Sequence, residues 1–307
     1  MRRSLSRFTI VALLLGGAQV YPETTGATFP PEARGDWEAS GGSGERVRIE
    51  AAHVVTSLGG KVAIARLERH NQSELQVRSW GLLEQWEIAA KGDTLRLTRQ
   101  GKTAEFHRLR EPAPDLELKA LPLGNVTSIS PEQVAGIQTE IAARIAADQK
   151  VRQEESPQAE VGEVDRANCQ SLRRLFAEIG WVERRTFGAS TAGSALVLAK
   201  HCNDLSLMMT LLPFIERDFK NPGNNDDAQV YAVFYDGLQL ALGNKQKYGS
   251  QLGEDRNGNP MVLPLEDVER VDQLRKELGL APLAEYLELA SKFFYEGRPI
   301  RLPRADE

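Results

Sequence analysis

The spacing of the apolar residues changes once along this chain, near Ser130, and this change constrains the fold more than any other feature. In residues 36–109, apolar and polar residues alternate in short runs such as "KVAIARL" and "EQWEIAA", which is the pattern of strands with one buried face. After Ser130, apolar residues recur every three or four positions, which is the pattern of amphipathic helices. The sequence therefore predicts an α+β protein of two domains: a small antiparallel β meander or barrel-like sheet, followed by a mainly helical domain.

Turn residues and prolines indicate where the domains begin and end. Pairs such as Gly92-Asp93 and Gln100-Gly101 separate six or seven expected strands. A proline-rich stretch then leads to Ser130, which forms a capping box with Gln133 at the start of the first helix. The predicted boundaries are residues 36–110 for the β domain, 111–130 for the linker, 131–296 for the helical domain and 297–307 for a tail.

The N-terminus has the pattern of a secretory signal peptide. Three arginines within the first seven residues precede an apolar run over residues 8–18. Eleven helical residues span only about 16 Å, roughly half of a bilayer core. We expect residues 1–18 to be a signal peptide, with the cleavage site as late as residue 27, and the protein to be exported, either periplasmic or secreted. The alternative is a buried N-terminal helix.

The charge balance argues against one class of partner. The whole chain has a net charge of −5, and removal of the three signal arginines leaves 35 basic against 43 acidic residues, a net charge of −8. Nucleic-acid binding needs a basic face, so no nucleic-acid partner is predicted. Beyond the signal, no stretch is long and apolar enough to cross a bilayer, so no stable membrane insertion is expected after cleavage.

The apolar stripe of the first predicted helix ends in charged residues. Steps of three and four residues beyond Ile145 lead to Asp148 and Arg152, which places both on the apolar face. These two residues therefore either point inward or form an ordinary ion pair between neighbouring turns at a fraying helix end.

The second predicted helix follows a flexible acidic connection over residues 154–163. Steps back from Leu172 on its apolar face lead to Asn168 and Asp165. Asp165 either points inward with the apolar residues or only caps this helix, because it precedes the apolar run.

Two later helices repeat this arrangement. His201 shares a stripe with Leu198 and Leu205, and Arg275 follows Val271 on the same helix face. Each has an ordinary explanation, since a lone histidine can be a satisfied core residue and an arginine can extend to solvent. Because a buried charge costs several kcal/mol unless it is paired, we interpret the inward polar groups of the four helices as one shared cluster.

Both cysteines follow residues of the expected cluster: Cys169 follows Asn168, and Cys202 follows His201. In an oxidising compartment, an even number of cysteines favours a disulfide, which would stabilise the fold by roughly 2–4 kcal/mol. The sequence is compatible both with a Cys169–Cys202 disulfide and with two separate buried thiols.

Several short segments of the second half, in this order, resemble a widespread bacterial family known only as a domain of unknown function, number 6624 in that series. The resemblance covers about half of the chain, from near Pro131 to near Tyr286. No single segment is specific, but their order is. The segments are "DQKVR" at 148–152, "VDRANCQSL" at 164–172, "GW" at 180–181, "AKHCND" at 199–204, "KYGSQ" at 247–251, "VDQLRKELGL" at 271–280 and "LAEY" at 283–286.

The resemblance implies a mainly helical fold and no particular reaction. Two positions depart from the family pattern: Val182 stands where a proline usually follows Gly-Trp, and Gly237 follows Asp236 where an arginine is more usual. The polar signature that the resemblance implies is Asp148, Gln149, Arg152, Asp165, Asn168, His201, Gln246, Tyr248, Gln251 and Arg275.

The first functional hypothesis is a binding module. Arg152 or Arg275 would hold an anionic group through its planar guanidinium. Gln246, Tyr248 and Gln251 would contact the polar groups of a small ligand or of a partner protein. In this hypothesis the loop that carries these three residues closes over the inward polar faces and turns toward the histidine.

The second hypothesis is a hydrolase-type enzyme in which His201 is the general base, oriented by Asp165 or Asp204. The sequence contains no G-x-S-x-G, H-E-x-x-H or P-loop motif. One inward histidine with a few scattered carboxylates is a sparse ligand set for a metal ion, so no metal and no cofactor are predicted. The third hypothesis is a purely structural cluster that closes on itself.

Overall fold

The structure is a computed structural model that describes residues 27–303 apart from 59–60, 71–74, 80–81, 119, 126–127, 155–156, 222 and 256. The predicted signal peptide lies outside the described residues. The chain forms two compact units. We call Met1–Leu118 with Pro222–Glu307 the barrel unit and Lys119–Asn221 the helical unit, so the predicted helical domain over residues 131–296 contributes to both.

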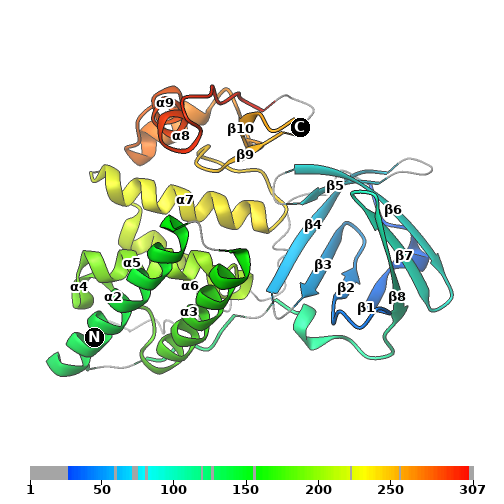
Figure 1. Ribbon diagram of the computed structural model, residues 1–307, viewed down its shortest axis with the longest axis horizontal. Helices are drawn as coiled ribbons and strands as arrows, with labels where there is room; N and C mark the ends of the chain where they lie inside the picture. The colour runs from blue at the N-terminus through cyan, green and yellow to red at the C-terminus, as the bar shows by residue number, and fades with distance from the viewer. Residues whose placement is uncertain are drawn as a thin grey trace, which may run out of the picture. The chain divides into compact units, whose positions relative to one another are not determined.

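The described strands of the N-terminal part form one closed antiparallel barrel (Figure 1). Each strand pairs with the next one along the chain, and the last pairs with the first, with Trp37 opposite Arg108. The predicted meander is therefore confirmed, with eight strands where six or seven were expected. They are β1 (Gly35–Ala39), β2 (Arg46–Ile49), β3 (His53–Leu58), β4 (Lys61–His70), β5 (Leu75–Ser79), β6 (Leu82–Lys91), β7 (Thr94–Arg99) and β8 (Lys102–Arg108).

Apolar side chains fill the interior of the barrel. Alternate residues of the strands point inward, as the period-two pattern requires, and among them Trp37, Leu97 and Phe106 have no exposed surface. The indole of Trp37 donates a hydrogen bond to the carbonyl oxygen of Ala33 at 2.8 Å, which satisfies its one polar atom. Trp86 is also buried, so both tryptophans serve as core residues, as expected for so small a β unit.

In the residues that the structure describes, the C-terminal part of the barrel unit has three helices and a two-stranded sheet. Asn224 caps the first helix by accepting hydrogen bonds from the backbone N–H groups of Asp226 and Asp227. Gly279 ends the second with a left-handed backbone. The elements are α7 (Asn225–Ala241), β9 (Leu252–Glu254), β10 (Pro260–Val262), α8 (Val271–Leu278) and α9 (Leu283–Phe294).

The helical unit begins with the predicted capping box. The hydroxyl of Ser130 accepts from the Gln133 backbone, and the Gln133 side chain accepts from the Ser130 backbone. Its helices are α2 (Pro131–Gln153), α3 (Gln158–Ile179), α4 (Arg184–Phe187), α5 (Ala189–His201) and α6 (Leu205–Phe219), of which α2, α3 and α5 pack against one another.

One expectation about the helical unit is wrong. Residues 154–163 were expected to be a flexible connection, but α3 begins at Gln158, because Val161 is buried and extends the apolar face by a turn beyond the predicted start. Asp165 therefore lies inside the helix and does not cap it. The helix ends as predicted at Gly180, whose φ of 81° suits glycine.

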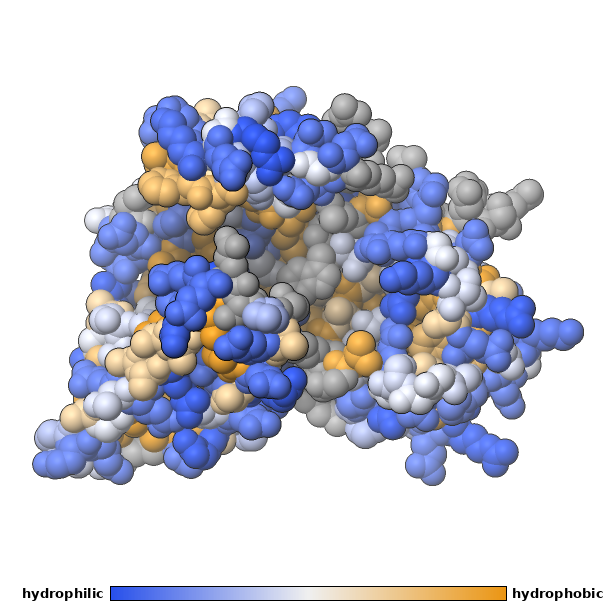
Figure 2. All heavy atoms as spheres, viewed as in Figure 1, coloured by the Kyte–Doolittle hydropathy of each residue, from blue (hydrophilic) through white to orange (hydrophobic). Residues whose placement is uncertain are grey.

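Hydrophilic residues cover most of the visible face of each unit, with apolar residues among them (Figure 2). Among the helices of the described segments, none has both the length and the apolar character needed to cross a bilayer.

Candidate functional site

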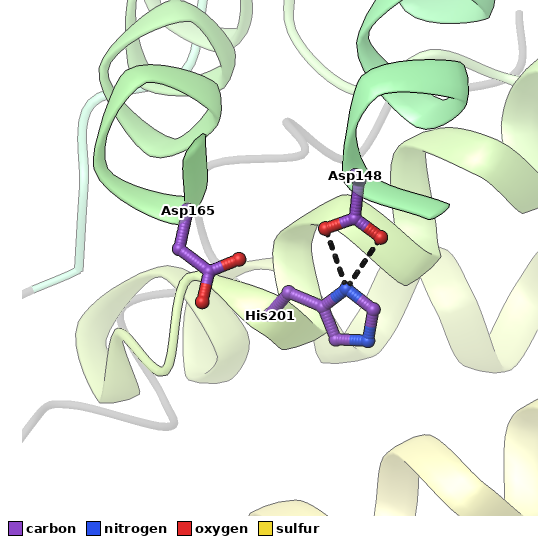
Figure 3. A group of neighbouring side chains, drawn as sticks. All are labelled: Asp148, Asp165 and His201. Carbon is purple, nitrogen blue, oxygen red and sulfur yellow. Dashed lines mark hydrogen bonds and ion pairs between the residues drawn. The ribbon is translucent and has the colours of Figure 1, made fainter. Parts of the chain in front are cut away.

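A histidine–aspartate pair joins the C-terminal ends of two helices of the helical unit. His201 is the last residue of α5, and Asp148 lies near the end of α2. Nδ1 of His201 lies 2.9 Å from Oδ1 and 3.1 Å from Oδ2 of Asp148 (Figure 3). Asp148 is completely buried, whereas the His201 side chain keeps 26% of its surface exposed. The sequence spacing correctly placed both residues inward, and the structure brings them together.

Arg152 and Gln149 hold the Asp148 carboxylate from the other side. The guanidinium of Arg152 contacts both carboxylate oxygens of Asp148 at 3.2–3.4 Å and also donates to Oδ1 of Asp165. The side-chain amide of Gln149 donates to Oδ2 of Asp148 at 3.1 Å. Four of the predicted site residues thus share a hydrogen-bond network with His201, and this network joins α2, α3 and α5.

The network fixes the ionisation of its buried carboxylate. Burial alone would raise the pKa of Asp148, but hydrogen bonds and positive charge from Arg152 and His201 outweigh burial and lower it. The guanidinium of Arg152 forms ion pairs with the carboxylates of both Asp148 and Asp165. The positive charge of Arg152 is therefore already paired with acidic side chains, which argues against the expectation that Arg152 binds an anionic ligand.

The opposite nitrogen of the imidazole is available for chemistry. A carboxylate at Nδ1 requires a proton there, so the neutral ring keeps its lone pair on Nε2. Within the described residues of the helical unit, no group forms a hydrogen bond with Nε2 of His201. Nε2 of His201 is thus a proton acceptor on a ring whose orientation is fixed at Nδ1 by the buried carboxylate of Asp148.

The same residues have a spacing that could hold a cation. Asp148, Asp165 and His201 each offer one ligand atom, and these atoms lie within 4.8 Å of one another. The guanidinium of Arg152 already bridges the two carboxylates, however. A metal ion would have to displace a positive charge that is in place, and we assign no metal to this cluster.

Asn168 lies one helical turn after Asp165 on α3 and is only 4% exposed. Its amide nitrogen Nδ2 is buried and has no hydrogen-bond partner among the described residues. Leaving a buried donor unsatisfied costs about 1–3 kcal/mol, so this amide is a candidate to bind a polar group of a ligand or a water molecule.

Asp204 does not orient the histidine. Its Oδ1 accepts a hydrogen bond from the Leu207 backbone at 3.1 Å, which caps α6, and its Oδ2 forms an ion pair with Arg173. The carboxylate hydrogen-bonded to His201 is that of Asp148, which the sequence hypothesis did not name for this role. The reason is that helix packing, which spacing along one helix does not reveal, determines which carboxylate meets the ring.

The remaining predicted site residues lie in the barrel unit and form a second network. Its centre is Asp236 of α7, a fully buried residue whose carboxylate accepts hydrogen bonds from the backbone N–H groups of Lys247, Tyr248 and Ser250 at 2.8–3.2 Å. The hydroxyl of Ser250 donates to the same carboxylate at 2.8 Å. Burial raises the pKa of Asp236, and these hydrogen bonds act in the opposite direction. This carboxylate fixes the loop, and it does so without the arginine that is more usual at position 237 in the family pattern.

The side chains of that loop bind backbone groups. Gln246 donates to the carbonyl oxygens of Gln251 and Leu263, and Gln251 donates to that of Val233. The ring of Tyr248 is buried and packs edge-on against Tyr231 and Tyr235, which lie on α7. Each side chain therefore has a structural role within the barrel unit.

Arg275 completes the second network. This guanidinium is 1% exposed, donates to the carbonyl oxygens of Tyr248 and Ala281, and lies over the ring of Tyr286 at 5.1 Å. The inward position that spacing predicted is therefore confirmed. Its contacts tie α8 to the loop and to α9, which is the self-contained arrangement of the structural hypothesis.

Comparison with known proteins adds the family. The model of DUF6624, described as a family of unknown function, matches residues 135–295. No curated protein and no solved structure matches the chain. The matched region is more than half of the 307 residues and contains all the predicted site residues of both networks. The chain therefore belongs to the DUF6624 family of unknown function.

Proposed function

We propose that the helical unit carries a small-molecule site in which Nε2 of His201 accepts a proton from a bound water or ligand, as in a hydrolase-type enzyme. The observation that carries this proposal is the contact of Nδ1 with the buried Asp148 at 2.9 Å, in a side chain that is still partly exposed. A buried, hydrogen-bonded carboxylate at one ring nitrogen is the arrangement that makes the other nitrogen a general base.

The charges of the cluster suit this role. When Nε2 takes up a proton, the imidazole becomes a cation beside a carboxylate that is already ionised, so Asp148 stabilises the product of the proton transfer. Arg152 and Gln149 keep this carboxylate in place through their hydrogen bonds. A positioned general base of this kind typically contributes about 10²- to 10⁴-fold to a reaction rate.

The class of ligand follows from the groups around the ring. The cluster offers an acceptor at His201 and a buried donor at Asn168, while Arg152 is matched by two carboxylates. These features favour a small, polar and uncharged ligand over a strongly anionic one, because the guanidinium that could bind an anion is already paired with two carboxylates.

A second candidate is a ligand-binding site without catalysis. It is supported by the hydrogen bonds around His201, Asp148 and Arg152, which among the described residues include no serine, threonine or cysteine side chain that could act as a nucleophile. A general base can activate water without one, so a binding site and a water-activating site share the same geometry and differ in whether turnover occurs.

We also propose that the protein is exported. Support comes from the arginines and the apolar run of residues 8–18, which have the composition of a signal peptide. N-terminal sequencing of the protein purified from the periplasm or medium tests this proposal, and an intact Met1 on protein that stays in the cytoplasm contradicts it.

The test of the catalytic proposal compares His201→Gln with wild type on a panel of chromogenic esters, phosphoesters and glycosides. We expect turnover of at least one class, with a loss of about 100-fold or more in kcat for the variant. His107→Gln is the matched control, since this side chain is 53% exposed on the barrel. Equal turnover by wild type and His201→Gln contradicts the role of His201 as the general base. Equal thermal stabilisation of both proteins by polar ligands contradicts the binding site.

A further inference from the structure

The two cysteines of the chain face each other in the helical unit. Cys169 lies on α3, and Cys202 directly follows the last residue of α5. Both are free thiols, the helices α3 and α5 pack against each other, and each thiol shifts the pKa of the other. The expected proximity of the two residues is thus present, without the covalent bond.

The two thiols differ in accessibility. Cys202 is 3% exposed, whereas Cys169 is only half-buried. Beside Cys169 lies the carboxylate of Asp204, whose Oδ2 accepts from Sγ at 4.0 Å. Arg173 forms an ion pair with the same carboxylate, and its positive charge lowers the pKa of Cys169. A reagent from solvent therefore meets Cys169 first, beside a positive charge.

The surroundings of the two thiols also shift their pKa values in opposite directions. The hydrogen bond from Cys202 lowers the pKa of Cys169, with the charge of Arg173 acting in the same direction and burial and Asp204 opposing it. The same hydrogen bond, together with burial, raises the pKa of Cys202. Since the thiolate is the nucleophile in disulfide chemistry, Cys169 has the properties of the attacking sulfur.

We propose that Cys169 and Cys202 form a reactive dithiol site that exchanges with disulfides, in which the half-buried, more accessible Cys169 attacks and the buried Cys202 resolves. Its substrate class is a small-molecule or protein disulfide that reaches the Arg173 side of α3. This inference concerns a different chemistry from the general base at His201 and does not depend on it.

The exchange has two steps. The Cys169 thiolate attacks one sulfur of the substrate disulfide, whose S–S bond breaks, and the second substrate sulfur leaves as a thiolate that takes up the proton lost by Cys169. Cys202 then loses its proton and attacks the Cys169 sulfur of the mixed disulfide, which releases the other substrate sulfur as a thiol. The chain is oxidised by two electrons to a Cys169–Cys202 disulfide, and the substrate disulfide is reduced to two thiols.

The position of the product disulfide links it to the neighbouring cluster. Cys169 follows Asn168 and Cys202 follows His201, so a bond between them would tie α3 to the end of α5 beside both residues. Oxidation therefore constrains the segment that carries the histidine, whatever reaction occurs there.

The test uses the reduced full-length protein and dithiobis(nitrobenzoate), a chromogenic disulfide. We expect the native wild type to release two thionitrobenzoates, to lose two hydrogens by intact mass and to carry no adduct. The second release should be first order and independent of reagent concentration, since it is intramolecular. Cys202→Ser should release one equivalent and keep one adduct, and Cys169→Ser should react at least about tenfold more slowly.

Three results would overturn the proposal. The first is a wild-type protein that carries a stable adduct on each sulfur. The second is a second release whose rate rises with reagent concentration. The third is Cys169→Ser reacting as fast as wild type. The wild-type kinetics decide the outcome even where a serine variant fails to fold, and circular dichroism of each variant identifies that case.

Discussion

Asp148 and His201 are 53 residues apart in the sequence, yet Nδ1 of the histidine lies within 3.1 Å of both carboxylate oxygens of the aspartate. The contact joins the ends of α2 and α5, and Arg152 extends it to Asp165 on α3. Three helices of the helical unit therefore meet at one ionised carboxylate, and both the stability and the proposed chemistry of the unit depend on it.

Replacement of Asp148 by asparagine should destabilise the protein. The variant keeps the shape of the side chain but loses the charge-assisted hydrogen bonds with Arg152 and His201, so we expect the free energy of unfolding to fall by about 2 kcal/mol. Denaturant unfolding at pH 7 measures this change. Asp93→Asn is the matched control because its side chain is 90% exposed, and it should stay within about 0.5 kcal/mol of wild type. A similar result for both variants argues against a buried ionised pair.

Replacement of Asp236 should destabilise the barrel unit. Asp236→Asn exchanges one acceptor oxygen for a donor that faces backbone N–H groups of the 247–250 loop, so we expect a loss of about 2–4 kcal/mol. Asp226→Asn at the exposed start of α7 is the control and should cost less than about 0.5 kcal/mol. Hydrogen exchange should show faster exchange of the loop amides in Asp236→Asn, and unchanged exchange there contradicts the assigned role.

Two glycines should respond in opposite directions to alanine. Gly249 has a φ of 71°, and a Cβ there would lie 2.9 Å from Cδ1 of Leu283, so Gly249→Ala should destabilise by about 1–3 kcal/mol. Gly136 lies inside α2 with nothing within 4 Å of the added carbon, so Gly136→Ala should stabilise by about 0.5–1 kcal/mol. Thermal unfolding of both variants tests this contrast, and a tolerated Gly249→Ala contradicts the described loop conformation.

His53 in the barrel should make stability depend on pH. Burial and the nearby charge of Arg66 lower its pKa from 6.5 to about 4. Between pH 6.5 and 4, His53 binds a proton in the unfolded chain but stays neutral in the folded chain. The free energy of unfolding is therefore unaffected above pH 6.5 and falls as the pH drops toward 4. His53→Gln lacks this proton uptake, and its loss of stability between pH 7 and 4.5 should be about 2–3 kcal/mol smaller. If the free energy of unfolding falls with pH by the same amount in wild type and His53→Gln, His53 is not a buried neutral group in the folded protein.

Much of the fold could be predicted from residue spacing because each element has one buried face. The period-two pattern indicated the meander, and helical steps placed Asp148 and Arg275 inward, where the structure has them. Arg152 keeps 32% of its side chain exposed and forms the alternative ion pair with Asp148 one turn away. Closure of the barrel through β1 and β8 depends on the curvature of the whole sheet, which no local pattern contains. The start of α3 was placed too late because Val161 is a single apolar residue among charged ones.

The site was less predictable because its contacts are tertiary. Spacing shows that two side chains point inward, but the pairing of Asp148 with His201 depends on how α2 packs against α5. The loop with Gln246, Tyr248 and Gln251 was expected to turn toward the histidine, and the contacts found for these residues are with the backbone and with tyrosines of the barrel unit. The sequence feature that could have indicated these local contacts was Asp236 on the preceding helix. A buried carboxylate there requires hydrogen-bond donors, and the loop supplies them.

The most direct test of the central claim is the protonation of the His201 ring, read by ¹⁵N–¹H correlation NMR of the ¹⁵N-histidine-labelled protein. The His201 signals are assigned by their absence in His201→Gln, since the chain has four histidines. For the neutral ring we predict the Nδ1–H tautomer with an unprotonated Nε2, and a redistribution toward Nε2–H in Asp148→Asn. A neutral His201 protonated at Nε2 in the wild type, or signals that Asp148→Asn leaves unchanged, would contradict its assignment as a proton acceptor oriented by Asp148.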